Sequence, residues 1–240
     1  MGTAIGVTSG KGGTGKTFLT GGVSSCLAAL GRRVLCIDTD VGLRNLDLVL
    51  GLADRTAMDF SDVLAGRCSL ERALVPHPDM KGLFLLAAPQ RPLPDAVFSA
   101  GMGELLDRAR TMFDYCLIDG PAGLGAGFRF AVGQADRAIV VTTMEAASLR
   151  DAQQAIWALG DLGITRRHLV VNRLRPRCLK KLGATIDDAM DFVGLPLLGV
   201  VPEDERVLLA GAREVPLLLA GKSRAAAACR NIAERMEGRR

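Results

Sequence analysis

The sequence of 240 residues lacks the features of membrane and secreted proteins. Although 49% of the residues are hydrophobic, no uninterrupted apolar run approaches the roughly 20 residues that a membrane-spanning helix needs. The start, Met1-Gly2-Thr3, has neither a basic patch nor a separate apolar segment, so we expect no secretory signal. We therefore expect a cytoplasmic protein that forms a single domain over residues 1–240, a length sufficient for one sizeable core.

The sequence also lacks the closely spaced cysteine pairs that are typical of metal and redox sites. The chain has six cysteines but no C-x-x-C pair, a pattern that disfavours zinc binding and thiol–disulfide exchange. We expect these cysteines to be reduced and structural. They are Cys26, Cys36, Cys68, Cys116, Cys178 and Cys229.

What the chain does contain is a complete phosphate-loop pattern, G-x-x-x-x-G-K-[ST]. It consists of Gly10, Lys11, Gly12, Gly13, Thr14, Gly15, Lys16 and Thr17. Glycines let the backbone turn its N–H groups toward a phosphate, and a helix that begins at the loop adds its positive end. We expect Lys16 to meet the β/γ-phosphates and the Thr17 hydroxyl to ligate Mg²⁺. A strand predicted over 3–8 and a helix predicted over 17–30 supply the required setting, which disfavours a mere glycine-rich turn.

Apolar strand-like runs alternate with helical segments along the rest of the chain. They span Arg33–Asp38, Leu83–Ala88, Tyr115–Asp119, Ala138–Thr143, His168–Asn172 and Leu197–Val201, with surface loops expected at residues 76–78 and 89–94. The alternation predicts an α/β fold of three layers, in which helices cover both faces of a mostly parallel, twisted sheet. Ligands of such sheets bind beyond the carboxyl ends of the strands, where the candidate residues lie.

Three carboxylates close two of these strands. Asp119 ends the run Tyr115–Asp119, and there it can hold a water molecule of the Mg²⁺ shell. We assign Asp40 to orienting the water that attacks the γ-phosphate, and Asp38 to the metal's water shell. The alternative is that these acidic residues only form turns.

Lys11 is a second lysine inside the loop. A site that already holds Lys16 and Mg²⁺ gains little from another cation unless that cation comes from a facing protomer; otherwise Lys11 is an exposed loop residue. With Lys11 the loop resembles the KGG-x-GK-[ST] signature of the deviant Walker A ATPases of the MinD/ParA family. That resemblance implies a P-loop NTPase fold, ATP and Mg²⁺, an ATP-dependent homodimer, and a first lysine that reaches the partner's nucleotide.

Residues 38–52, DTDVGLRNLDLVLGL, resemble the D-x-D-x-GLRNLD segment of the MinD branch, whereas partition ATPases usually carry D-x-D-P-Q. The resemblance continues through residues 119–123, 142–151 and 202–204. It implies a switch ATPase that regulates division-site placement, with MinC-like and MinE-like partners that read the ATP dimer around Arg44 and Asp151.

The base site is predicted around Asn172 and Arg173. An asparagine amide presents a donor and an acceptor, which matches the adenine edge and favours ATP over GTP. In the relatives this asparagine contacts adenine, and the Pro-Glu-Asp turn corresponding to Pro202, Glu203 and Asp204 offers backbone to the base. Phe18 departs from the family, because a hydroxyl residue that helps bind the α-phosphate commonly stands there.

The final segment also departs from the MinD branch, whose members usually end in an amphipathic membrane-binding helix. Here small residues recur at helical spacing, so we expect this helix to pack on the sheet, and contact with the inner face of the cell membrane stays open. These residues are Ala225, Ala228, Cys229, Ile232, Ala233 and Met236.

Three alternatives remain at this stage. One is a flagellar-number or cargo-positioning ATPase of the same fold. Another is a ParA-type partition ATPase that binds DNA through residues 222–240, which carry six cations against two acids, although we do not expect specific nucleic-acid binding. The last is an iron–sulfur carrier, which would be brown after anaerobic purification.

Overall fold

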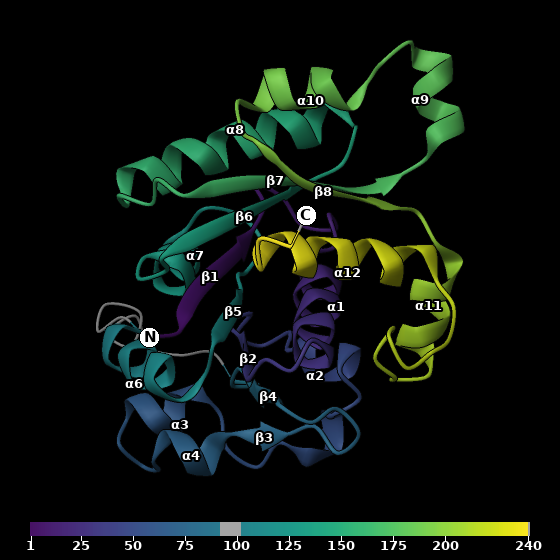
Figure 1. Ribbon diagram of the computed structural model, residues 1–240. Helices are drawn as coiled ribbons and strands as arrows, with labels where there is room; N and C mark the ends of the chain where they lie inside the picture. Colours follow the sequence, from purple (N-terminus) through teal and green to yellow (C-terminus); the bar gives the residue numbers. More distant parts are fainter. Residues whose placement is uncertain (92–101, 240) are drawn as a thin grey trace.

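The computed structural model describes residues 1–91 and 102–239 and contains an eight-stranded sheet with the strand order β3-β4-β2-β5-β1-β6-β7-β8 (Figure 1). The strands are β1 (Thr3–Thr8), β2 (Val34–Asp38), β3 (Val75–Pro76), β4 (Leu83–Leu86), β5 (Tyr115–Asp119), β6 (Arg137–Thr142), β7 (Arg167–Leu174) and β8 (Leu197–Pro202). All neighbouring pairs are parallel except β3 with β4. The predicted sheet architecture is therefore confirmed.

Helices cover both faces of the sheet (Figure 1). One face carries α1 (Lys16–Ala29), α2 (Leu46–Val49), α11 (Glu205–Ala212) and α12 (Arg224–Met236). The other carries α3 (Phe60–Leu64), α4 (Leu70–Ala73), α6 (Gly103–Met112), α7 (Ala126–Val132), α8 (Ala146–Asp161) and α10 (Ile186–Val193). A 3-10 helix, η1 (Ala53–Arg55), follows α2, and α9 (Pro176–Leu182) projects beyond the end of β7 (Figure 1).

Side-chain alternation along the central strands divides the core into two clusters. Ala138 and Val140 of β6 pack with the α6–α8 side, whereas Ile139 and Val141 pack with the α1–α12 side. Successive side chains of a strand point to opposite faces, so a strand that is apolar throughout requires helices on both sides. This requirement is why the chain forms three layers.

Helix α12 belongs to the core, as its stripe of small residues predicts. Five of the six predicted residues are buried, namely Ala225, Ala228, Cys229, Ile232 and Ala233. The helix lies so close to β8 that a Cβ atom added at Gly199 would come within 2.4 Å of Ile232 Cγ1. Met236 is partly buried at the end of the same contact.

Two local predictions need correction, and residues 92–94 of the predicted loop at 89–94 lie outside the described residues. Pro76, predicted in a surface loop, lies in the edge strand β3, where the N–H that proline lacks is not needed for the ladder. Strand β7 was predicted to end at Asn172 but continues to Leu174, because the register with β8 shifts between Val171 and Leu174. Among the described helices, none has the length and apolar character needed to span a bilayer.

Candidate functional site

The loop between β1 and α1 forms a tight cradle at the carboxyl end of the central strand. Gly13 and Gly15 have φ angles of 79° and 91°, a region that favours glycine. A Cβ atom added at Gly15 would lie 2.3 Å from Asn172 Nδ2, and one added at Gly10 would lie 2.1 Å from the Asp151 carbonyl oxygen. The loop is thus held between β7 and α8, with backbone N–H groups available at the start of α1 for an anion.

Lys16 is buried at the base of this cradle, with 7% of the residue exposed. Its Nζ donates a hydrogen bond to Ser9 Oγ at 3.2 Å. Burial lowers the pKa of Lys16, while the charges of Asp119 and Asp40 oppose that shift. A phosphate bound in the loop would supply the negative charge that this desolvated ammonium group lacks, so the residues present fit a nucleotide.

Asp38 and Asp119 are directly paired across β2 and β5, and both are buried. Burial, with the neighbouring Asp38 charge adding to it, raises the pKa of Asp119 to about 7. Burial also raises the pKa of Asp38 to about 6, although its carboxylate accepts hydrogen bonds from the backbone N–H groups of Leu46 and Asp40. Two buried carboxylates side by side favour the binding of a cation, which would lie between these carboxylates and a bound phosphate.

Thr17 and Thr20 bring the start of α1 to the same point. Thr20 Oγ1 donates to Asp119 Oδ1 at 3.2 Å, and a hydrogen bond from Thr17 lowers the pKa of Asp119. Within residues 1–91 and 102–239, no group of three or more His, Cys, Asp or Glu side chains could hold a metal ion. Mg²⁺ suits such a site, because it is commonly held by one or two carboxylates, water molecules and phosphate oxygens.

Asp40 lies where the chain leaves β2, close enough to Lys16 for the two charges to influence each other. Burial raises its pKa, and Lys16 counteracts this effect. Its carbonyl oxygen accepts from the Arg44 N–H at 3.0 Å, and Arg44 Nε donates to Asp47 Oδ2 at 2.6 Å. Arg44 has a φ of 44°, so residues 40–47 form a compact turn beside the phosphate loop.

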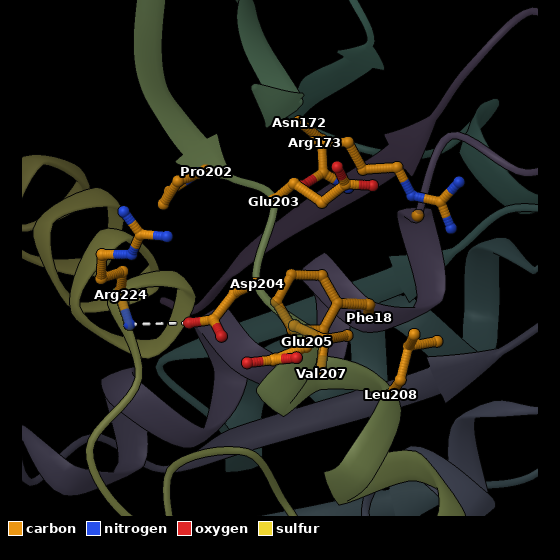
Figure 2. Close-up of a pocket in the computed structure, with 11 residues that line it drawn as sticks. Phe18, Asn172, Arg173, Pro202, Glu203, Asp204, Glu205, Val207, Leu208 and Arg224 are labelled. Atoms are coloured by element: carbon orange, nitrogen blue, oxygen red, sulfur yellow. Dashed lines mark hydrogen bonds between the residues drawn. The ribbon is translucent and has the colours of Figure 1, made fainter. Parts of the chain in front are cut away.

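A cavity of about 610 Å³ opens on one side of the loop (Figure 2). It is lined by Gly15, Phe18, Asn172, Arg173, Pro202, Glu203, Asp204, Glu205, Val207, Leu208 and Arg224. Buried Asn172 donates from Nδ2 to the Thr14 carbonyl oxygen at 2.7 Å, which leaves its amide oxygen for a ligand. The predicted base-site residues Phe18, Asn172, Arg173, Pro202 and Glu203 thus meet in one cavity.

Four residues that line this cavity were not predicted from the sequence, namely Glu205, Val207, Leu208 and Arg224. Asp204 accepts hydrogen bonds from Ser223 Oγ and the Arg224 N–H, both at 2.8 Å, and so joins α11 to the start of α12 (Figure 2). Val207 and Leu208 come from α11. Asp204 belongs to the predicted Pro-Glu-Asp turn, whereas no spacing in the chain connects Arg224 with Asn172.

Lys11 lies outside the cavity described above. It lines a second cavity, of about 670 Å³, together with Gly12, Gly13, Thr14, Met144, Glu145, Arg175 and Cys178, among others. The described residues lining the first cavity do not include Lys11. Lys11 Nζ pairs with Glu145 Oε2 at 3.1 Å, and 34% of the lysine side chain is exposed. The two lysines of the loop therefore occupy different environments.

The sheet, the glycine cradle and the buried lysine define a nucleotide-binding protein of the P-loop class. Residues 5–217 match the model of the CobQ/CobB/MinD/ParA nucleotide binding domain. The chain belongs to this family, and within it to the MinD group. The predicted family and fold class are confirmed.

The similarity to MinD proteins extends over nearly the whole chain. The septum site-determining protein MinD of Synechocystis is 42% identical over 240 residues, which cover 99% of this chain and 90% of the relative. The structure of the MinC:MinD complex of Aquifex aeolicus has a TM-score of 0.88 at 36% identity and covers 98% of this chain and 96% of that one. MinD of Pyrococcus horikoshii with Mg-ADP has a TM-score of 0.86 at 31% identity and covers 99% and 96%.

Proposed function

We propose that this MinD-type ATPase works as a dimerising switch in division-site placement. Two subunits bind ATP and Mg²⁺ and close face to face, each Lys11 completes the site of the other subunit, and hydrolysis to ADP and phosphate reopens the dimer. The observation that carries the proposal is the position of Lys11, which does not line the base cavity and is partly exposed beside a neighbouring cavity. A cation supplied by a second subunit can stabilise the charge that develops on the transferred phosphoryl group.

The residues around the phosphates take distinct roles in this proposal. Lys16 binds the β/γ-phosphates, and Thr17 ligates Mg²⁺, whose water shell is held by Asp38 and Asp119. Asp40 orients the attacking water, a role that suits a partly buried carboxylate beside the phosphate loop. The Mg-ADP complex of the Pyrococcus relative supports ATP and Mg²⁺ as the ligands of this site.

The proposal also covers the choice of adenine as the base and the protein partners of the dimer. Asn172 selects adenine through its amide oxygen, and Arg173, Pro202 and Glu203 surround the nucleoside. We propose that residues 1–240 act as one domain in the cytoplasm. The MinC:MinD complex of Aquifex supports a MinC-like partner for the ATP dimer, with a MinE-like partner reading the same dimer near Arg44 and Asp151.

The proposal is tested by light scattering on an Asp40→Ala protein, in which hydrolysis is blocked. We expect a dimer with Mg-ATP and a monomer with Mg-ADP. The same measurement on Asp40→Ala combined with Lys16→Ala is the control, and it should show a monomer with either nucleotide. A protein that stays monomeric with saturating Mg-ATP would contradict the switch.

A further inference from the structure

Phe18 forms a fixed wall of the base cavity. It is the third residue of α1, is partly buried against the α1–α12 cluster, and lines the cavity of about 610 Å³. Its ring lies over Gly22, one turn further along the helix, where an added Cβ atom would be 4.0 Å from Phe18 Cε2. The same atom would be 2.9 Å from Cys229 Sγ, so α12 closes the space behind the ring.

Leu208 supplies a second apolar wall. It lies on α11 beside Val207, lines the same cavity, and is 75% exposed. Figure 2 shows the Phe18 ring beside Val207 and Leu208, with Asn172 further along the cavity. Large apolar side chains at the mouth of a cavity that also contains a few polar groups are typical of small-molecule sites.

Resting on the proposed function, we propose that Phe18 and Leu208, side by side in the cavity, form an apolar clamp on which the sugar–base part of ATP packs. Phe18 carries no hydroxyl group, so at this position the α-phosphate meets only the backbone N–H groups of the helix start. Compared with a site that has a hydroxyl residue here, the α-phosphate therefore contributes less to the binding free energy and the nucleoside contributes more. An aromatic ring beside a base or sugar is well suited to this role, since truncation of such rings weakens the binding of bases.

The clamp is tested by calorimetric titration of the full chain with Mg-ATP and with Mg-tripolyphosphate, which has the phosphates but no nucleoside. We expect Phe18→Ala to weaken ATP binding about tenfold, equivalent to about 1.4 kcal/mol, and to change tripolyphosphate binding less than about twofold. Phe18→Leu, which keeps an apolar wall, should recover part of the ATP affinity. Equal losses for both ligands, or no loss for ATP, would overturn the clamp.

A second pair of variants does not depend on the packing of Phe18. Leu208→Ser should weaken ATP binding about threefold and leave tripolyphosphate binding unchanged, because only the nucleoside covers that side chain. Leu209→Ser is the matched control: Leu209 is the next residue of α11, is 46% exposed, and is not among the described residues that line the cavity. If the two serine variants bind ATP equally, the clamp is wrong. If Lys16→Ala binds both ligands as well as the unaltered chain does, the phosphate site itself is wrong.

Discussion

Lys11 and Glu145 form an ion pair within one subunit, with 3.1 Å between Lys11 Nζ and Glu145 Oε2. Glu145 is the N-cap residue of α8, and its side chain is 73% exposed. An exposed pair of this kind contributes about 0–1 kcal/mol. If Lys11 must leave Glu145 to reach the nucleotide of a second subunit, the pair favours the monomer only slightly, as a reversible switch requires.

Glu145→Gln should therefore make ATP-dependent dimerisation easier. The released lysine needs no separation from a carboxylate, so we expect the dimer dissociation constant with Mg-ATP to fall about two- to fivefold. Sedimentation over a concentration series in the Asp40→Ala background measures this change. Glu71→Gln, which removes a similar exposed ion pair with Arg108 on another part of the molecule, should have no effect. Weaker dimerisation of the Glu145→Gln protein would show that Glu145 supports the dimer instead.

Alanine substitutions of the two lysines of the loop should affect different properties of the protein. Lys11→Ala should abolish ATP-dependent association and retain nucleotide binding, because Lys11 lies outside the base cavity. Lys16→Ala should weaken binding itself by at least about tenfold, because it removes the buried cation beside the phosphates. Titration with a fluorescent ATP analogue and light scattering, run in parallel, give the two readouts. Dimerisation of Lys11→Ala with Mg-ATP would contradict a lysine acting across the interface.

Asn172→Ala should reduce the preference for ATP over GTP. The variant removes the amide oxygen proposed to accept from adenine, together with the hydrogen bond from Nδ2 to the Thr14 carbonyl. Loss of such buried hydrogen bonds costs about 1–3 kcal/mol, so we expect about a tenfold loss of ATP affinity and a smaller loss for GTP. Competition titrations with the two nucleotides report the ratio. An unchanged ratio would place base selection elsewhere.

The stability of the nucleotide-free protein should fall as pH rises, in part through Asp119. Burial raises the pKa of Asp119 from an ordinary 3.8 to about 7, so between pH 4 and 7 the folded chain binds a proton that the unfolded chain does not. The free energy of unfolding therefore falls as pH increases across that window. Without nucleotide and Mg²⁺, Asp119→Asn should melt roughly 4–8 °C above the unaltered protein at pH 8, equivalent to about 2 kcal/mol.

At pH 5.5 the difference in melting temperature should be about half as large, because this pH lies midway through the window in which only the folded chain keeps the proton. Thermal melts followed by circular dichroism at the two pH values make the comparison. A constant difference between the proteins at both pH values would show that the gain does not come from the carboxylate charge.

Gly199→Ala should destabilise the protein by displacing α12 from the sheet. The added Cβ would lie 2.4 Å from Ile232 Cγ1, and overpacking of this kind typically costs about 1–3 kcal/mol. Gly211→Ala is a matched control, because Gly211 lies in α11 with no atom within 4 Å of an added Cβ. That change should stabilise the protein by about 0.4–1 kcal/mol. Urea unfolding of both variants measures the difference, and equal stabilities would contradict the close packing of α12.

The phosphate loop and the mostly parallel sheet could be predicted from the sequence because both depend on local pattern, whereas the strand order β3-β4-β2-β5-β1-β6-β7-β8 could not. The loop requires glycines at fixed spacing before a lysine and a threonine, and buried parallel strands require continuous apolar runs. The packing of α12 against the core could also be predicted, because small residues at i, i+3 and i+4 indicate one buried face of a helix. The boundaries of the strands did not follow from local pattern: β7 extends to Leu174 with a register shift against β8, which the sequence of β7 alone does not indicate.

The sequence by itself determined that a phosphate would be bound and where along the chain, since that chemistry lies within eight consecutive residues. Only the tertiary structure decided which distant residues complete the site. It paired Asp38 with Asp119 across neighbouring strands and brought Leu208 and Arg224 into the cavity of Asn172. It also placed Lys11 beside Glu145, 134 positions later in the chain. Contacts of this kind depend on how the layers pack in three dimensions, and the spacing of residues along a chain does not contain that information.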